Sequence, residues 1–189
     1  MAAVVIEDYD PTWPEQFERL AAGLRPHLGD GSVAIDHIGS TAVPGLSAKD
    51  VIDIQVTVAD VAQADRLAPA FERAGYRATP YRHDHRPAGD QSDPGLWDKR
   101  LWQSQPGARR VNVHVRVAGW PNQRYALLFR DYLRARPQAA AAYARLKRGL
   151  AGRLGDDLAA YTDLKDSACD LIVVAAEDWA AAGRDATSG

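Results

Sequence analysis

Cysteine is nearly absent from this sequence, since Cys169 is the only one among 189 residues. A single cysteine excludes an intrachain disulfide and any metal site built from several thiolates of this chain. In a helical segment such a residue is usually small, buried and apolar, so we expect packing rather than a reactive thiol at Cys169.

Long apolar runs and an excess of charge are missing too. No stretch approaches the ~20 apolar residues of a membrane-spanning helix, and the first residues, MAAVVIEDYDPTW, include acids and no basic start. The formal net charge is −2 and the sequence pI is about 6.2, which favours neither nucleic acid nor an anionic membrane as a partner. We therefore expect a cytoplasmic protein without nucleic-acid or membrane partners.

The composition is that of an ordinary folded chain, with 46% hydrophobic and 25% charged residues. A chain of this length can bury one sizeable core. Strand-like alternation occurs up to Val117, helical spacing dominates from Pro121 onward, and no Pro/Ser-rich linker separates the two parts. We predict an α+β core over residues 1–120, a C-terminal helical bundle packed on it over 121–183, and a tail over 184–189.

The segment IDHIGSTAVPGLSAKDVIDIQVT, residues 35–57, contains two predicted strands and the turn between them. Apolar and polar residues alternate before Gly39, which interrupts the pattern. Ser40 and Thr41 follow at a possible helix start, where free N–H groups and hydroxyl donors favour an anion. We expect a phosphate group to bind at Gly39, Ser40 and Thr41.

The second of these strands, Val51 to Val58, places one carboxylate on its polar face. Asp53, Gln55 and Thr57 alternate there with an apolar row that points the other way. Asp53 is either a ligand for Mg²⁺ or an acid that hydrogen-bonds a neighbour. The amide oxygen of Gln55 can also coordinate a cation, although it lacks the charge that a two-metal site needs.

A second polar row lies on the predicted hairpin formed by Leu96 to Ser104 and Arg109 to Val117. Four valines of the second arm alternate with Arg110, Asn112, His114 and Arg116. If this strand and Val51 to Val58 share a sheet, both polar rows line one face, and we expect Asn112 to bind substrate there. His114 is either a general base or metal ligand, because imidazole titrates near neutral pH, or a polar residue that contacts its cross-strand neighbour.

Basic residues supply the other candidate ligands. Lys49 follows the bend at residues 43–45 and either reaches the same phosphate oxygens as Ser40 or is a solvated loop lysine. Arginines of the hairpin either bind an anionic substrate or lie along exposed apolar surface; these are Arg100, Arg110 and Arg116. Lys165 lies one helical turn after Tyr161. Its side chain either contacts a bound nucleotide or only packs against the neighbouring residues.

The loop from Arg82 to Gly95 is too polar and too interrupted by Pro and Gly for regular structure, yet long for a simple connection. We interpret it as a mobile loop on the substrate side. His83 and His85 either ligate a metal there or are solvated, and Arg82 and Arg86 are alternative phosphate contacts.

Several short motifs together resemble the signature of the GrpB family, small proteins assigned to the nucleotidyltransferase superfamily with its polymerase-beta-like fold. The motifs are His37-Ile38-Gly39-Ser40-Thr41, Val43-Pro44-Gly45-Leu46, Lys49, Ile52-Asp53-Ile54, Asn112-Val113-His114-Val115, residues 125–133, and Tyr161 with Lys165. The resemblance implies a mixed or antiparallel nucleotidyltransferase-like sheet with helices on one face and a C-terminal helical bundle. Polymerase-beta-type proteins hold a nucleoside triphosphate and Mg²⁺ with a Gly-Ser turn and two acids, and Gln55 stands where the second acid is usual.

Two functions stay open at this point. The resemblance implies an enzyme that binds a nucleoside triphosphate with Mg²⁺ at Ser40 and Asp53 and transfers a nucleotidyl group to a small acceptor. The alternative is a non-catalytic nucleotide- or coenzyme A-binding module that partners a dephospho-CoA kinase, because some relatives are fused to that enzyme. A P-loop and a serine-hydrolase elbow are both excluded, since GSTAVPGLSAK matches neither pattern.

Overall fold

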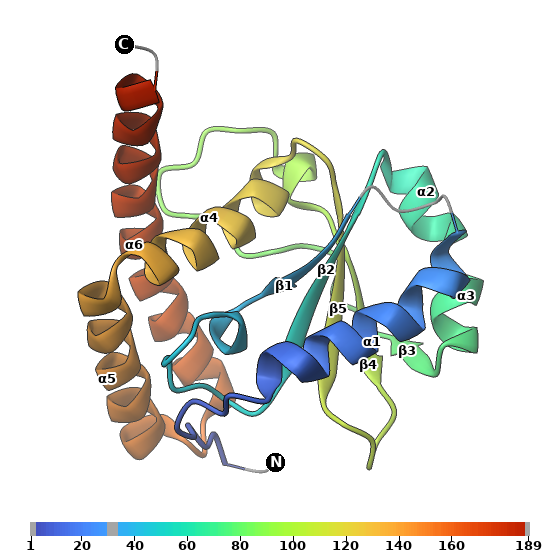
Figure 1. The fold of residues 1–189 in the computed structure, drawn as a ribbon, viewed down its shortest axis with the longest axis horizontal. Coiled ribbons are helices and arrows are strands. Elements are labelled where there is room, and N and C mark those ends of the chain that lie inside the picture. Colours follow the sequence, from blue (N-terminus) through green and yellow to red (C-terminus); the bar gives the residue numbers. More distant parts are fainter. Residues whose placement is uncertain (1–2, 30–33, 188–189) are drawn as a thin grey trace.

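The computed structural model describes residues 3–29 and 34–187 of the chain. It contains helices and strands in mixed order (Figure 1). In chain order the elements are α1 (Trp13–Leu28), β1 (Ala34–Ile38), η2 (Ser40–Ala42), β2 (Ile52–Val58), α2 (Val61–Arg66), α3 (Ala68–Arg73), β3 (Tyr76–Ala78), η3 (Pro94–Trp97), β4 (Arg100–Ser104), β5 (Val111–Val117), α4 (Pro121–Ala135), α5 (Pro137–Leu154) and α6 (Leu158–Thr187).

The five strands form one sheet in the order β1-β2-β5-β4-β3. Strands β2 and β5 pair in parallel at its centre, and the other neighbours are antiparallel. The register places Asp53 opposite Asn112 and Gln55 opposite His114, so the two polar rows lie side by side on one face. The predicted α+β class with a mixed sheet is confirmed.

The apolar face of the sheet carries the main core. Ile52, Ile54, Val56 and Val58 alternate on β2 with the polar row and are fully buried. The valines of β5 share this core with side chains of α1, α2 and α3, which lie against that face (Figure 1). Helix α2 begins directly after Asp60, because the Asp60 carboxylate accepts a hydrogen bond from the Gln63 amide at 2.6 Å.

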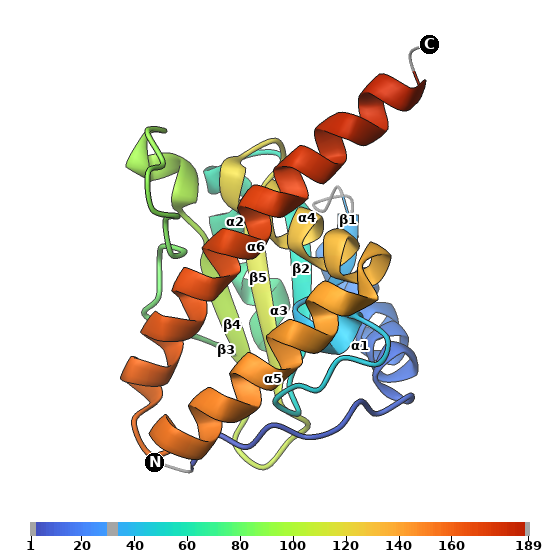
Figure 2. The same cartoon turned by 90° about the vertical axis from the view of Figure 1, so that its left-hand side faces the viewer.

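The C-terminal helices lie over the opposite, polar face (Figure 2). A second apolar cluster fixes them in place by joining α4, α5 and α6 to Val43 and Leu46, which follow the Ser40 turn. The helices and the polar strand rows therefore enclose a space between them. Helix α6 continues to Thr187, into the predicted tail, and residues 188–189 lie outside the described residues. In the described part of the chain, no helix is both long and apolar enough to cross a bilayer.

The difference in burial between two aliphatic side chains predicts that their replacement by alanine lowers the free energy of unfolding by very different amounts. Ile54→Ala removes side-chain volume from a position with 0% exposure and should lower the free energy of unfolding by about 2–5 kcal/mol. Leu171→Ala, at a position with 75% exposure on α6, should change it by no more than about 0.5 kcal/mol. Urea denaturation of both variants measures this, and similar losses would contradict the described core.

Candidate functional site

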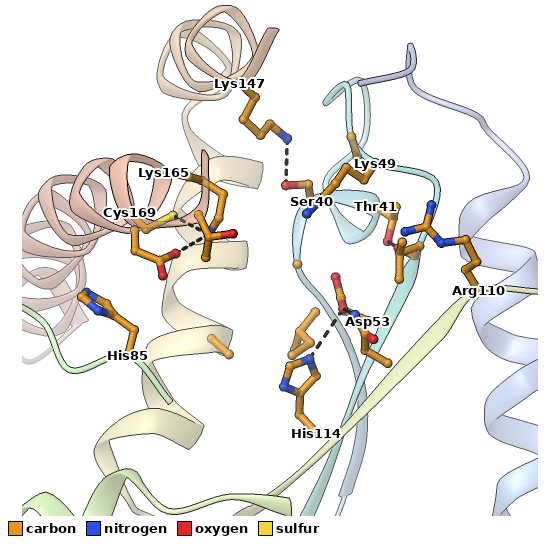
Figure 3. A pocket seen from close by; sticks show the side chains of 18 of the residues that line it. Ser40, Thr41, Lys49, Asp53, His85, Arg110, His114, Lys147, Lys165 and Cys169 are labelled. Carbon is orange, nitrogen blue, oxygen red and sulfur yellow. Dashed lines mark hydrogen bonds and ion pairs between the residues drawn. The ribbon is translucent and has the colours of Figure 1, made fainter. Parts of the chain in front are cut away.

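A cavity of about 1010 Å³ separates the polar face of β2 and β5 from the C-terminal helices. Figure 3 shows side chains from the turn at Ser40, from both strands and from α5 and α6 around this space. The structure brings most of the predicted site residues to its wall, namely Gly39, Ser40, Thr41, Lys49, Asp53, Arg110, Asn112, His114 and Lys165. Gln55 and Arg100 are not in the wall.

Gly39 brings the turn and the strand into direct contact. Its φ of +71° is a conformation that L side chains rarely adopt. A Cβ atom at this position would lie only 2.6 Å from Oδ2 of Asp53. The Asp53 carboxylate therefore rests against the backbone that leads into Ser40, and only glycine permits this approach.

One oxygen of Asp53 is held by neighbouring side chains. Oδ1 accepts a hydrogen bond from Asn112 at 2.8 Å and lies 3.6 Å from Nε2 of His114. Burial alone would raise the pKa of Asp53, but the contacts with His114 and Asn112 and the charge of Lys49 outweigh it and hold the pKa below its ordinary value. Among the described residues none donates a hydrogen bond to Oδ2, so that oxygen is available to a ligand.

His114 supports Asp53 and is not placed as a general base, which corrects one alternative from the sequence. Arg116 Nη2 lies 3.2 Å from Nδ1 of His114. A guanidinium can only donate, so Nδ1 accepts and the proton of the neutral ring is on Nε2, facing Asp53. Burial and the nearby Arg116 charge lower the pKa of His114, which favours this neutral form. Neither ring nitrogen is left to take a proton from a substrate.

The structure also corrects the prediction of Gln55 as a metal ligand. Its Oε1 accepts a hydrogen bond from Arg116 at 2.7 Å, and its Nε2 donates to the carbonyl of Gln123 at 3.3 Å. The side chain is fully buried, so both ends of the amide are committed. The guanidinium of Arg116 thus lies beside Gln55, the position at which the sequence resemblance implied a second carboxylate.

No described group of three or more His, Cys, Asp or Glu side chains could hold a metal ion by itself. His83 and His85 do not converge, because His83 lies 2.7 Å from Asp98 and His85 lies 3.0 Å from Asp170 on α6. The loop that carries these histidines is thereby attached to the C-terminal helix.

Arg100 lies on the wrong side of the sheet for the predicted role. It stands opposite Val115 in the register and therefore points to the face covered by α2. There its guanidinium donates to both carboxylate oxygens of Asp65, at 2.6 and 3.1 Å. The predicted contact between Arg100 and a substrate in the cavity is corrected accordingly.

Thr41 braces the turn through its side chain. Its hydroxyl donates to the carbonyl of Val51 at 3.2 Å and lies 3.0 Å from Nε2 of His37. Burial lowers the pKa of His37 to about 4, so this ring is neutral at physiological pH. The hydroxyl of Thr41 is therefore committed to the fold, and that of Ser40 is the one offered to the cavity.

Lys147 on α5 is a site residue that the sequence prediction missed. Its Nζ donates to Ser40 Oγ at 2.8 Å and to the carbonyl of Ser47, and the side chain is only 3% exposed. Burial is the main cause that lowers its pKa to about 7. The available signal was its position four residues after Tyr143 on the apolar stripe, which places both side chains on the inner helix face.

Other cations face the same end of the cavity. Lys49 Nζ lies 5.2 Å from the centre of the Tyr161 ring, and no carboxylate of the described chain is within ion-pair distance of it. Burial and the charge of Lys165 lower the pKa of Lys49. Lys165 contacts Asp166, and Arg110 is exposed at the cavity rim. Positive charge thus exceeds negative charge around Ser40, as an anionic ligand requires.

A largely buried ion cluster forms another part of the cavity wall. Asp84 accepts hydrogen bonds from Arg116 at 2.8 and 3.0 Å and from Lys99 at 2.6 Å. Burial opposes its ionisation, but these two cations outweigh that effect and hold the pKa of Asp84 far below its usual range. The guanidinium of Arg116 is therefore engaged by Asp84 and Gln55 and is not a free donor for a substrate.

Known proteins resemble this chain over most of its length. The family described as GrpB protein matches residues 3–174. The crystal structure of the conserved protein GrpB from Enterococcus faecalis has a TM-score of 0.74 and 33% sequence identity, covering 93% of this chain and 99% of that one. The UPF0157 protein BH1888 of Halalkalibacterium halodurans is 34% identical over 166 residues, which cover 88% of this chain and 78% of that protein.

A dephospho-CoA kinase of Mycolicibacterium paratuberculosis is also similar. It is 41% identical over 189 residues, which cover 90% of this chain but 45% of the kinase. The chain therefore spans less than half the length of this relative.

Two glycine substitutions separate backbone strain from the contact with Asp53. Gly39 and Gly45 both have positive φ, but a Cβ at Gly45 meets no atom within 4 Å. Gly45→Ala should lower the free energy of unfolding by about 1 kcal/mol. Gly39→Ala should cost more and displace the Asp53 carboxylate, because its Cβ has no room. Urea denaturation and crystal structures of both variants check this, and an unmoved Asp53 in Gly39→Ala would contradict the contact.

Proposed function

The chain belongs to the GrpB family, and on that basis we propose that its cavity binds a nucleoside triphosphate and transfers a nucleotidyl group to a small acceptor. One observation carries the proposal. The Ser40 turn and the Asp53 carboxylate meet at one end of the cavity, and the basic side chains of Lys49, Lys165 and Arg110 line the same cavity. A triphosphate with its metal ion has the charges that this arrangement complements.

The phosphates lie against the positive side of the cavity. Ser40 donates through its hydroxyl, while Lys49, Lys165 and Arg110 provide charge-assisted contacts to the phosphate oxygens. Asn112 holds Oδ1 of Asp53, so that Oδ2 points to the same region. A cavity of about 1010 Å³ lies at the upper end of the usual range for ligand pockets and leaves room for an acceptor beside the nucleotide.

The residues at this end fit one Mg²⁺ ion and not two. Mg²⁺ usually binds through one or two carboxylates together with substrate phosphates, and Asp53 supplies one such carboxylate. A bound ion would neutralise charge on the phosphates and orient them. Gln55 is committed to Arg116 and Gln123, so the position two residues after Asp53 supplies neither an acid nor a free amide oxygen. Asp53 is thus the catalytic residue of the proposal, and His114 and Asn112 position it.

A second candidate is a non-catalytic module that binds a nucleotide or coenzyme A and partners a dephospho-CoA kinase. The engagement of Gln55 by Arg116 favours it, because a site with one acid binds phosphates more readily than it catalyses their transfer. The 41% identity to a dephospho-CoA kinase supplies the candidate partner. Nucleic acid is not among the proposed ligands, and the cytoplasmic location stays a prediction.

Calorimetry with ATP, CTP, GTP and coenzyme A, each with and without Mg²⁺, distinguishes the two candidates. We expect a triphosphate to bind in the presence of Mg²⁺, and Asp53→Asn to weaken that binding at least about tenfold, the scale of one charged contact. Asp65→Asn is the matched control, because Asp65 pairs with Arg100 on the opposite face of the sheet.

Release of pyrophosphate in a screen of small acceptors then tests turnover. Metal-independent binding of coenzyme A, unchanged in Asp53→Asn and without pyrophosphate release, would favour the module and contradict the enzyme.

A further inference from the structure

Ser40 and Lys147 are in direct contact, and this contact suits a role beyond phosphate binding. The Nζ of Lys147 lies 2.8 Å from Ser40 Oγ, and Ser40 lines the cavity (Figure 3). We propose that Ser40 is a nucleophile and Lys147 its general base, so that Ser40 carries the nucleotidyl group covalently before the acceptor receives it. The nucleotide as substrate rests on the proposed function, whereas the nucleophile and base rest on their own contacts.

The position of Lys147 is fixed by three contacts. Its Nζ contacts Ser40 Oγ and the carbonyl of Ser47, and it lies 4.7 Å from the centre of the Tyr143 ring. Within the part of the chain that the structure describes, no carboxylate lies within ion-pair distance of this amine. In enzymes with an activated serine, the nucleophile is in hydrogen-bond contact with a base, and a third group orients that base. Ser-Lys pairs are one variant of this arrangement.

The surroundings of Lys147 favour its neutral form, which is the form that accepts a proton. Burial is the largest cause, and neighbouring cations add to it, so that the pKa is lowered to about 7. At neutral pH about half of the amines are therefore free bases, against roughly one in three thousand for a solvated lysine. The titratable and charged groups that face it are Cys169 and Lys165 on α6, Lys49 before β2, and Tyr143 and Arg148 on α5.

The reaction has two balanced half-steps. Ser40 Oγ attacks the α-phosphorus, Lys147 takes the hydroxyl proton, the bond from that phosphorus to the bridging oxygen breaks, and pyrophosphate leaves. The acceptor hydroxyl then attacks the same phosphorus and releases its proton to solvent. The bond to Ser40 Oγ breaks, and Lys147 returns its proton to the serine. Lys49 and Lys165 face the phosphate in both half-steps and offset its negative charge.

A small organophosphorus fluoride, diisopropyl fluorophosphate, tests the pair without any nucleotide. Its phosphorus bonds to the nucleophile, fluoride leaves, and the proton goes to the base. We expect one adduct, mapped to Ser40 by peptide mass spectrometry and absent in Ser40→Ala. Its rate should rise about tenfold from pH 6 to pH 8, because the neutral fraction of Lys147 rises through this range.

Two substitutions of Lys147 separate a base from a structural support. Lys147→Met removes the amine, and Lys147→Arg keeps a charged donor that cannot lose its proton. Both should slow labelling about a hundredfold or more. Ser167→Ala, at an exposed position on α6, should react like the parent protein. Labelling of Lys147→Arg at the parental rate, with thermal unfolding confirming its fold, would overturn the proposal.

Nucleotides labelled at the α-phosphate complete the test. We expect label on Ser40 after denaturation of the parent protein that had been incubated with the nucleotide and Mg²⁺. Calorimetric binding of the nucleotide without any label on Ser40 would overturn the covalent step and leave the proposed function standing. Absence of binding would instead overturn the proposed function. The reaction with the fluorophosphate would still show whether Ser40 and Lys147 act as nucleophile and base.

Discussion

The contact between the Gly39 backbone and the Asp53 carboxylate is the constraint on which the site depends. It joins a turn to the neighbouring strand with no space for a Cβ atom between them. The hydroxyl of Thr41 closes the same unit by bonding the carbonyl of Val51, just before β2. Ser40 and Oδ2 of Asp53 therefore face one cavity as parts of a single rigid unit, which is the preorganisation that phosphate chemistry demands.

The electrostatics of the cavity separate into two parts. In one part of the wall, Asp84 pairs with both Arg116 and Lys99, and Gln55 accepts a hydrogen bond from Arg116. Near Ser40, the amines of Lys49 and Lys147 have no carboxylate partner among the described residues, and burial lowers the pKa of both. An anion that binds there removes their mutual repulsion, so ligand binding and the charge state of the lysines are coupled.

Local patterns in the sequence predicted much of this arrangement. Alternation along β2 and β5 placed Asp53, Asn112 and His114 on one face, because side chains of a strand point alternately to its two sides. The pattern could not reveal that Gln55 donates a hydrogen bond to the carbonyl of Gln123, because Gln123 lies on α4, far along the chain from β2. The burial of Lys147 depends on the packing of α5 against the rest of the fold, so the sequence prediction missed this residue. The predicted division into a core, a bundle and a tail stays a prediction.

A crystal structure of the protein with a non-hydrolysable nucleoside triphosphate analogue and Mn²⁺ in place of Mg²⁺ tests the central claim most directly. The anomalous signal of manganese locates the ion independently of the nucleotide. The account predicts one manganese peak at Oδ2 of Asp53, with the phosphates between Ser40 and Lys49. Phosphates bound elsewhere in the cavity, or a manganese ion away from Asp53, would contradict it.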